Sequence, residues 1–408
     1  MCHLAIMITI NADRIAKYSS ANAARHEAKI QEIMEITDQE VQESLGTEEP
    51  KEIQRDVLYE HFKSNQSSFY SLTGFQITEF EKLWIHVEKA FTAPARGRKP
   101  KISAKDIIIL LLHYLRRYPR VEQIAAIFSL KSSTVQAIIT KYIPILAEIM
   151  KRNFIDAVAK EEIVYNQDFP ECAYIIDATV QEIYKPFISF EKAKKYFSGK
   201  HRIYCLKSQV IVTIKGLVVS IITSIPGSKH DKNIFDSYKK ELDALFSLHP
   251  NNSHKIIADK GYQEADSQIL VTPFKGNALD LTREKLSFNQ KLGGIRIIIE
   301  NFFGRLKSRY EIMSSTFRGS HETYAPIFTI CCALVNFEQI ECDHPLRERD
   351  MRFYVRLQAS IKQKVLESET KSRAKRRRQA RLRRRIFGEI GEDQSSSSSE
   401  EEFGYKLE

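Results

Sequence analysis

Three acidic residues stand at positions where they could bind a metal ion. Asp177 follows the apolar residues 174–176, Asp259 follows the apolar residues 256–258, and Glu300 follows three isoleucines. The two short apolar runs predict β-strands, and ligands of α/β sheets bind at the carboxyl ends of strands. A carboxylate in an apolar setting requires a cation or hydrogen bonds to compensate its burial. Three carboxylates that converge there would bind Mg²⁺ or Mn²⁺, which are hard ions that prefer oxygen ligands.

Such a site would be suited to phosphodiester chemistry. Two divalent ions about 4 Å apart can activate a water molecule and stabilise the leaving oxygen of a phosphodiester, without a nucleophilic Ser or Cys. Taken singly, Asp177 and Asp259 could be turn residues after a strand, and Glu300 could be a partly exposed helix residue. Asp231 could cap a helix, orient a metal ligand or contact substrate, while His230 is better explained as a supporting residue. The order strand-Asp, strand-Asp, helix-Glu favours the metal site.

Basic side chains near these acids would hold nucleic acid. Three of them share the predicted helix of Glu300. The candidates are Lys200, His201, Arg202, Lys207, Arg305, Lys307 and Arg309, and of these we expect Lys200, Arg202, Arg305 and Lys307 to contact DNA.

Alternating strands and helices are expected to position the acids. Apolar runs and alternation predict the strands, Lys215–Gly216 predicts a hairpin turn, and Asp231 is a plausible N-cap. The predicted strands are residues 173–176, 202–214, 217–225 and 255–258, and the predicted helices are residues 235–246, 295–313 and 325–340. This order predicts a mixed α/β core.

The region before this core has the pattern of a helix-turn-helix. Ser103 is expected to cap a helix, and residues 121–140 fit two short helices with Ala125 at their crossing and Ser129 at the turn. On this template the second helix would present one polar face to phosphates and base edges in a major groove. That face consists of Lys131, Ser132, Ser133, Gln136 and Thr140. A plain helical hairpin in an all-α domain is the alternative interpretation.

Composition and charge indicate a globular protein with a polyanionic partner. The chain has 408 residues, 43% of them hydrophobic, and a formal net charge of +10. Residues 1–92 carry 9 basic and 15 acidic side chains, which leaves most positive charge to the middle of the chain. Six cysteines without a CxxC pair indicate a reducing compartment rather than a disulfide scaffold. The longest apolar runs are far shorter than the about 20 residues of a membrane span, so we expect a soluble intracellular protein with no membrane partner.

The end of the chain is strongly polarised. Nine of the thirteen residues 373–385 are Lys or Arg, and a serine run with three glutamates follows. The basic run is interpreted as a nuclear localisation signal or a non-specific DNA arm, and a solvated helix end is the alternative. The Ser/Glu tail has too little apolar surface to fold and is expected to be disordered.

Several short motifs together resemble one family. They are residues 176–179 (IDAT), 196–201 (YFSGKH), 226–231 (PGSKHD), 258–262 (ADKGY), 272–274 (TPF), 288–289 (FN) and 299–307 (IENFFGRLK). In this order they resemble the DDE transposases of the Harbinger type, a eukaryotic group similar to some bacterial insertion-sequence transposases. Residues 70–143 are similar to the helix-turn-helix domain that precedes the catalytic domain of related transposases.

The resemblance implies a fold, a site and an activity. It implies an RNase H-like catalytic domain in which Asp177, Asp259 and Glu300 form the metal-binding triad, and in which Asp231 belongs to an additional HD motif. It implies metal-dependent cleavage of DNA, followed by attack of the freed 3′-hydroxyl on target DNA. The partners implied are transposon ends and target DNA, with a separate DNA-binding protein and a homo-oligomer as further possibilities.

These inferences give the expected organisation. The fold class is α/β, with an RNase H-like mixed sheet preceded by an all-α helix-turn-helix domain. The expected segments are an acidic helical region (1–67), the helix-turn-helix domain (68–152), the catalytic domain (165–345), a basic helical extension (346–387) and a disordered tail (388–408). The leading hypothesis is a nuclear DDE transposase or a nuclease derived from one, with two Mg²⁺ or Mn²⁺ ions. The alternative is a catalytically inactive, transposase-derived DNA-binding protein in transcription or chromatin.

Overall fold

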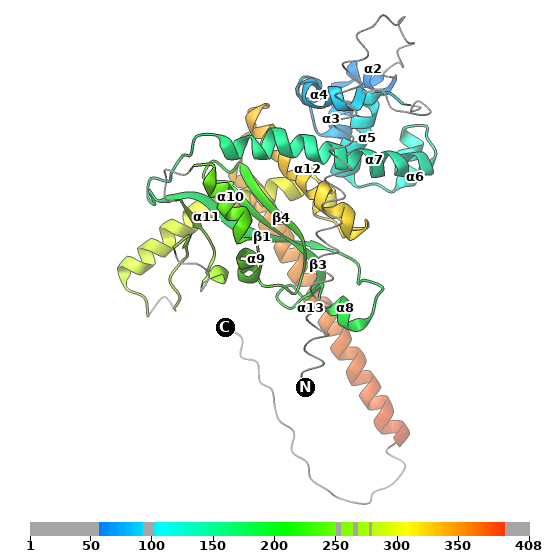
Figure 1. The fold of residues 1–408 in the computed structure, drawn as a ribbon. Helices are drawn as coiled ribbons and strands as arrows, with labels where there is room; N and C mark the ends of the chain where they lie inside the picture. Colours follow the sequence, from blue (N-terminus) through cyan, green and yellow to red (C-terminus); the bar gives the residue numbers. More distant parts are fainter. Residues whose placement is uncertain (1–56, 93–101, 250–253, 264–267, 277–279, 388–408) are drawn as a thin grey trace, which may run out of the picture. The chain divides into compact units, whose positions relative to one another are not determined.

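The computed structural model describes residues 57–92, 102–249, 254–263, 268–276 and 280–387 (Figure 1). Most of the predicted acidic N-terminal region and all of the predicted tail lie outside the described residues. The fold divides into two compact units. The first holds the described residues up to Tyr114 and Pro119–Ile149, and the second holds Leu115–Tyr118 and the residues from Met150 on.

The first unit is all-helical and has an aromatic and aliphatic core. Rings of Tyr59 and Phe69 pack on Phe80 with centroid distances of 5.6 and 5.3 Å. The Ser103 hydroxyl accepts a hydrogen bond from the amide of Asp106 at 3.0 Å, which confirms the predicted cap. Its helices are α2 (Val57–Lys63), α3 (Gln66–Thr73), α4 (Ile77–Thr92), α5 (Ala104–Arg117), α6 (Val121–Ile127) and α7 (Ser132–Lys151).

Helices α6 and α7 form the predicted helix pair. Ile124 and Ala125 of α6 and Val135 of α7 are buried, as the template requires. The turn closes with a hydrogen bond from the Leu130 amide to the Ala125 carbonyl at 2.9 Å. Ser129 has a φ of +51°, a left-handed conformation in which glycine would be less strained.

The second unit is built on a mixed six-stranded sheet. The strand order is β2-β3-β1-β5-β6. Strand β4 also pairs with β3, on the edge opposite to β1. Strand β1 is antiparallel to β3 and parallel to β5, which is in turn parallel to β6. The strands are β1 (Cys172–Glu182), β2 (Phe197–Ser198), β3 (Ile203–Thr213), β4 (Val218–Pro226), β5 (Lys255–Ile257) and β6 (Leu270–Val271). The fold class is thus confirmed: a helical region is followed by an α/β domain.

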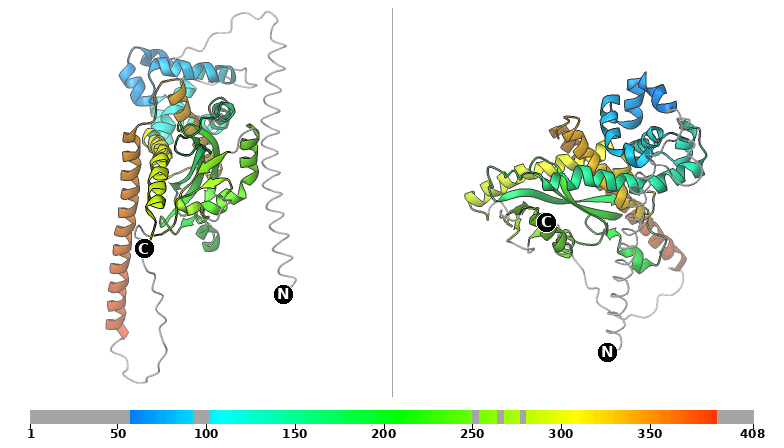
Figure 2. Two further views of the ribbon diagram at one scale, coloured as in Figure 1. Left: turned by 90° about the vertical axis from the view of Figure 1, so that its left-hand side faces the viewer. Right: turned by 45° about the horizontal axis from the view of Figure 1, so that its top comes forward.

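Helices cover both faces of this sheet. One face carries Phe235, Leu242 and Leu245 from α9 (Asp231–Ser237) and α10 (Lys239–Ser247). The other side carries α11 (Arg283–Arg309) and α13 (Glu348–Phe387), seen in yellow and orange in the left view of Figure 2. A further long helix, α12 (His321–Ile340), packs against β4. The short helical elements of the unit are η1 (Arg152–Asp156), η2 (Val158–Lys160), α8 (Phe190–Lys194), η3 (Lys260–Tyr262) and η4 (Glu311–Met313).

Buried polar side chains tie the elements of the second unit together. Asn336 of α12 is fully buried and accepts a hydrogen bond from the Val218 amide at 2.9 Å. Its amide group also donates to the carbonyls of Phe154 and Val218, at 2.6 and 2.8 Å. One side chain thereby forms hydrogen bonds with three buried backbone groups.

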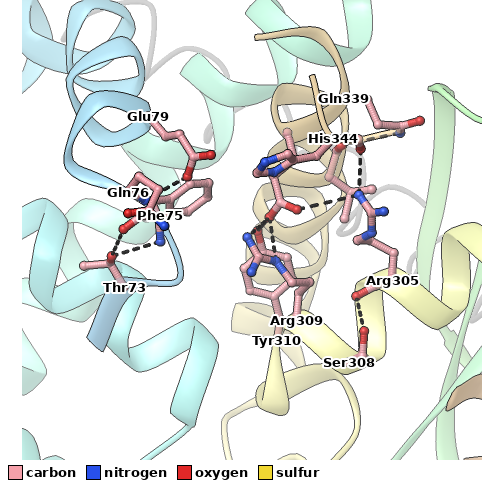
Figure 3. A network of polar contacts seen from close by, with 12 residues as sticks. Thr73, Phe75, Gln76, Glu79, Arg305, Ser308, Arg309, Tyr310, Gln339 and His344 are labelled. Atoms are coloured by element: carbon pink, nitrogen blue, oxygen red, sulfur yellow. Dashed lines mark hydrogen bonds and ion pairs between the residues drawn. The ribbon is translucent and has the colours of Figure 1, made fainter. Parts of the chain in front are cut away.

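A charged cluster joins α11, α12 and α13. Arg305 is 5% exposed and donates to Asp350 at 2.9 Å and to the carbonyls of His344 and Pro345. Glu338 of α12 accepts from Arg309 at 3.0 Å and lies 3.9 Å from Arg305 (Figure 3). Every charge in the cluster therefore has an opposite charge beside it, as burial requires.

Several details of the sequence prediction are wrong. The helix predicted over residues 295–313 begins at Arg283 and ends at Arg309. Asp177 does not end its strand, because β1 continues to Glu182 and stays paired with β3, with Asp177 opposite Val210. The predicted helix over residues 235–246 begins earlier and is broken at Tyr238, and its N-cap is His230. Asp231 is the first helical residue, and its carboxylate is bound by Lys207 of β3 instead of capping the helix.

Within the described ranges, no helix is both long and apolar enough to cross a membrane.

Candidate active site

The register of two parallel strands brings two of the predicted acids together. Ile175 of β1 pairs with Ile257 of β5, so Asp177 and Asp259 each lie two residues beyond a paired position. Strand β5 has ended there, which frees the space beside Asp177. The guanidinium of Arg296 on α11 lies between the two acids, 3.2 Å from Asp177 Oδ2 and 3.3 Å from Asp259 Oδ1.

Burial perturbs the Asp177 carboxyl. Its pKa is raised to about 6, chiefly because burial disfavours the charged form. Arg296 and a 2.8 Å hydrogen bond from the Ala178 amide lower this pKa, whereas the neighbouring Asp259 and Asp231 raise it. The charges of Asp259 and Asp231 therefore reach Asp177, and the Arg296 guanidinium opposes their effect on its pKa.

Asp231 is a third acid near this pair, and Lys207 holds its carboxylate in place. Lys207 Nζ is 2.9 Å from Asp231 Oδ1 and also donates to the Lys229 carbonyl at 2.7 Å. The pKa of the buried Tyr262 hydroxyl is raised first by burial and then by Asp177, Asp231 and Asp259. Tyr262 thus lies within electrostatic reach of all three aspartates.

Glu300 is placed differently from the aspartates. It lies one helical turn after Arg296 on α11, and it raises the pKa of Tyr354 on α13, as burial and Asp177 also do. Within the described part of the chain, no three His, Cys, Asp or Glu side chains are arranged so as to hold a metal ion. The structure therefore joins Asp177 and Asp259 through Arg296, places Asp231 near them, and leaves Glu300 outside a ready-made triad.

The pair of aspartates nevertheless fits a divalent cation. Both carboxylates contact one positive group, the Arg296 guanidinium, and their oxygens are the donors that Mg²⁺ and Mn²⁺ prefer. Asp177 and Asp259 are the residues that would hold such an ion.

These acids open into a cavity of about 720 Å³. Its lining includes Asp177, Asp231 and Asp259, together with Lys200, His201 and Arg202 from the turn between β2 and β3. The pKa of His201 is lowered to about 4, mainly by burial and then by Lys200 and Lys207, so the imidazole is neutral at pH 7. Residues of α13 also line the cavity.

Comparisons with known proteins agree with this arrangement. Residues 176–336 match the family described as "DDE superfamily endonuclease". Residues 100–152 match "Helix-turn-helix of DDE superfamily endonuclease". The chain contains a DDE superfamily endonuclease domain preceded by a helix-turn-helix domain. A relative from Microchaete diplosiphon, named "Probable transposase for insertion sequence element IS702", is 28% identical over 245 residues, which cover 59% of this chain and 83% of that protein. No solved structure matches the chain significantly.

The predicted DNA contacts of the endonuclease domain fall into two groups. Lys200 and Arg202 are exposed beside the cavity, although Arg202 forms an ion pair with Glu369 of α13. Arg305 is held in the charged cluster, and Lys307 is 6% exposed and donates to the Val180 and Met313 carbonyls. Burial lowers the pKa of Lys307 to about 8. Arg305 and Lys307 therefore stabilise the folded domain, and their buried charges are not accessible to DNA.

The helix-turn-helix domain presents the predicted polar face. Lys131, Ser133, Gln136 and Thr140 are exposed, and Ser132 is half-buried at the first position of α7. Gln136 donates to the Thr140 hydroxyl at 3.3 Å, so these two side chains lie together one turn apart. The arrangement is that of a helix able to meet a groove of DNA.

Two residues of the endonuclease site were missed from the sequence. Arg296 has a sequence signal, because it precedes Glu300 by four residues and so lies on the same helix face. Tyr354 has none, since it lies 177 positions along the chain from Asp177 and reaches the site only through the packing of α13.

Proposed function

We propose that this chain is a Harbinger-type transposase, which cleaves DNA and joins it to a target by a two-metal mechanism. The observation that carries the proposal is the pair Asp177 and Asp259, held by Arg296 within a domain that matches the DDE endonucleases. The relative named as a probable transposase supports the same activity.

In this mechanism Asp177 and Asp259 would hold the divalent ions, and Glu300 would join them as a third ligand. Such ions activate the attacking hydroxyl and stabilise the leaving oxygen of a phosphodiester. The chain's own residues bind and orient the substrate: Lys200 is exposed beside the acids and can bind a phosphate oxygen. Arg296 contacts both aspartates and lowers the pKa of Asp177, which burial raises, so it favours the charged form of Asp177.

The test is a plasmid nicking and strand-transfer assay with Mg²⁺ or Mn²⁺. We expect the wild type to nick DNA that carries suitable ends, and Asp177→Asn and Asp259→Asn to abolish nicking. Asp168→Asn is the matched control, because Asp168 is an exposed acid that pairs with Lys291 on the surface. Retained DNA binding without metal-dependent cleavage by the wild type would refute the enzyme and leave a DNA-binding protein derived from a transposase.

We infer further that the protein acts in the nucleus, with DNA as its main partner. Residues 373–379, which begin the basic run, are exposed on α13 and so accessible to an import receptor. A fluorescent fusion should concentrate in nuclei, and neutral substitutions across residues 375–378 should disperse it. Binding to a separate DNA-binding protein and self-association can be measured by light scattering with and without DNA ends.

A further inference from the structure

Helix α13 forms a wall of the catalytic cavity. It is fixed to α11 at its start, where Asp350 binds Arg305 and where the rings of Tyr354 and Phe303 lie 5.9 Å apart. A Cβ on Gly304 would lie 1.9 Å from the Asp350 carbonyl oxygen, so the two helices touch through backbone. From this anchor α13 passes the sheet and extends beyond it (Figures 1 and 2).

One face of α13 looks into the cavity over several turns. Its lining residues recur at intervals of three and four, the spacing of a single helix face. They include Tyr354, Gln358, Ile361, Lys362, Val365 and Arg373. At 1.5 Å per residue, the stretch from Tyr354 to Arg373 is about 28 Å long. Tyr354 lies near the acids, since Asp177 raises its pKa after burial has done so.

Three cations without an ion-pair partner among the described residues line the cavity along this face of α13. Lys200 of the turn between β2 and β3 and Lys362 and Arg373 of α13 all line the cavity, and all three are exposed. Among the described residues, no acidic group pairs with any of the three. The apolar Ile361 and Val365 of α13 line the same cavity. Such a groove binds a nucleic-acid strand, with phosphates on the cations and sugars and bases on the apolar surface.

One ion pair spans the route. Arg202 of the β2–β3 turn binds Glu369 of α13, both within the lining. A phosphate would compete with Glu369 for Arg202, because both are anions that a guanidinium binds in the same way.

We propose that α13 and the β2–β3 turn form a channel for one strand of DNA, which leads an unpaired or frayed end to Asp177 and Asp259. The volume of about 720 Å³ is that of a pocket for a small ligand, so a strand end fits where a double helix does not. The inference rests on the proposed function and specifies its substrate as the backbone of a single strand.

The first experiment compares two double variants of the full chain. Lys362→Glu with Arg373→Glu reverses two channel charges, and Arg356→Glu with Lys371→Glu makes the same change at exposed positions of α13 outside the channel. Binding of a duplex with a single-stranded extension, and of the blunt duplex, is measured by fluorescence anisotropy in EDTA. For the extended DNA, we expect the channel variant to lose about tenfold in affinity and about 1.4 in the salt slope, at roughly 0.7 per phosphate contact on a single strand.

A second variant, in contrast, is expected to increase the affinity for the extended DNA. Glu369→Gln frees Arg202 and should tighten binding of the extended DNA about threefold, without changing the affinity for the blunt duplex. Equal losses in both double variants, or no effect of Glu369→Gln, would overturn the channel. Because these assays contain no metal, they are separate from nicking: a wild type that nicks DNA while the channel variants bind normally would refute only the channel.

Discussion

The Asp177 carboxyl should lower the stability of the folded protein. Its pKa of about 6 lies above the ordinary 3.8, because the folded state disfavours its charged form. At about 1.36 kcal/mol per pKa unit, the difference corresponds to about 3 kcal/mol. Replacing the acid by a neutral amide of the same shape, Asp177→Asn, should therefore raise the free energy of unfolding by up to about 3 kcal/mol at pH 7.

The sign follows from proton linkage. Below about pH 3 the carboxyl is protonated in both folded and unfolded chains, so wild type and variant should be equally stable. As pH rises from about 4 to about 6, the unfolded chain releases its proton first, and the wild type loses stability that the variant keeps. Above pH 6 the difference should stay constant.

Urea denaturation between pH 4.5 and 8 measures this difference. Asp168→Asn serves again as the control, since an exposed acid should change stability by no more than about 0.5 kcal/mol. Adding Mg²⁺ should stabilise the wild type and not Asp177→Asn, because the ion supplies the missing charge compensation. A variant that is less stable than the wild type at pH 7, or a gain that is as large at pH 4.5, would refute the reasoning.

Two further predictions concern the framework around the site. Asp350→Ala leaves Arg305 without its closest carboxylate and should cost about 3 to 5 kcal/mol of unfolding free energy in thermal denaturation; a loss under 1 kcal/mol would show that Glu338 alone compensates the guanidinium. Asn336→Leu removes the three hydrogen bonds that Asn336 makes to the backbone of Val218 and Phe154 and should cost about 3 kcal/mol, at about 1 kcal/mol for each hydrogen bond. Unchanged stability of the Leu variant would mean that water reaches those groups.

The sequence predicts those parts of the fold that depend on neighbouring residues. The β3–β4 hairpin follows from alternation and from Gly216, whose φ of +81° suits glycine. The cap at Ser103 and the helix pair α6–α7 likewise depend on residues a few positions apart. The length of β1 could not be predicted, because it is set by pairing with β3 rather than by the local pattern around Asp177.

The candidate site is only partly visible in the sequence. The motifs identify Asp177 and Asp259, but not that Arg296 lies between them, which depends on the packing of α11 on β1. Charged residues such as Arg305 were expected at a DNA surface, since nothing nearby in the chain reveals Asp350, its partner 45 positions further on. For the same reason, the basic composition of α13 predicts a helix that faces solvent or DNA. That one face of α13 lines the cavity depends on tertiary packing and could not be predicted from the sequence.

The spacing of Arg296, Glu300 and Gly304 on one helix limits how the chain can change during evolution. These residues follow one another at single-turn intervals: the first binds the aspartates, and the last seats α13. Inserting or deleting one residue between them would rotate one end of α11 against the other by about 100° and shift it by about 1.5 Å. Length variation among relatives should therefore avoid residues 296–305 and accumulate in exposed turns such as Lys215–Gly216.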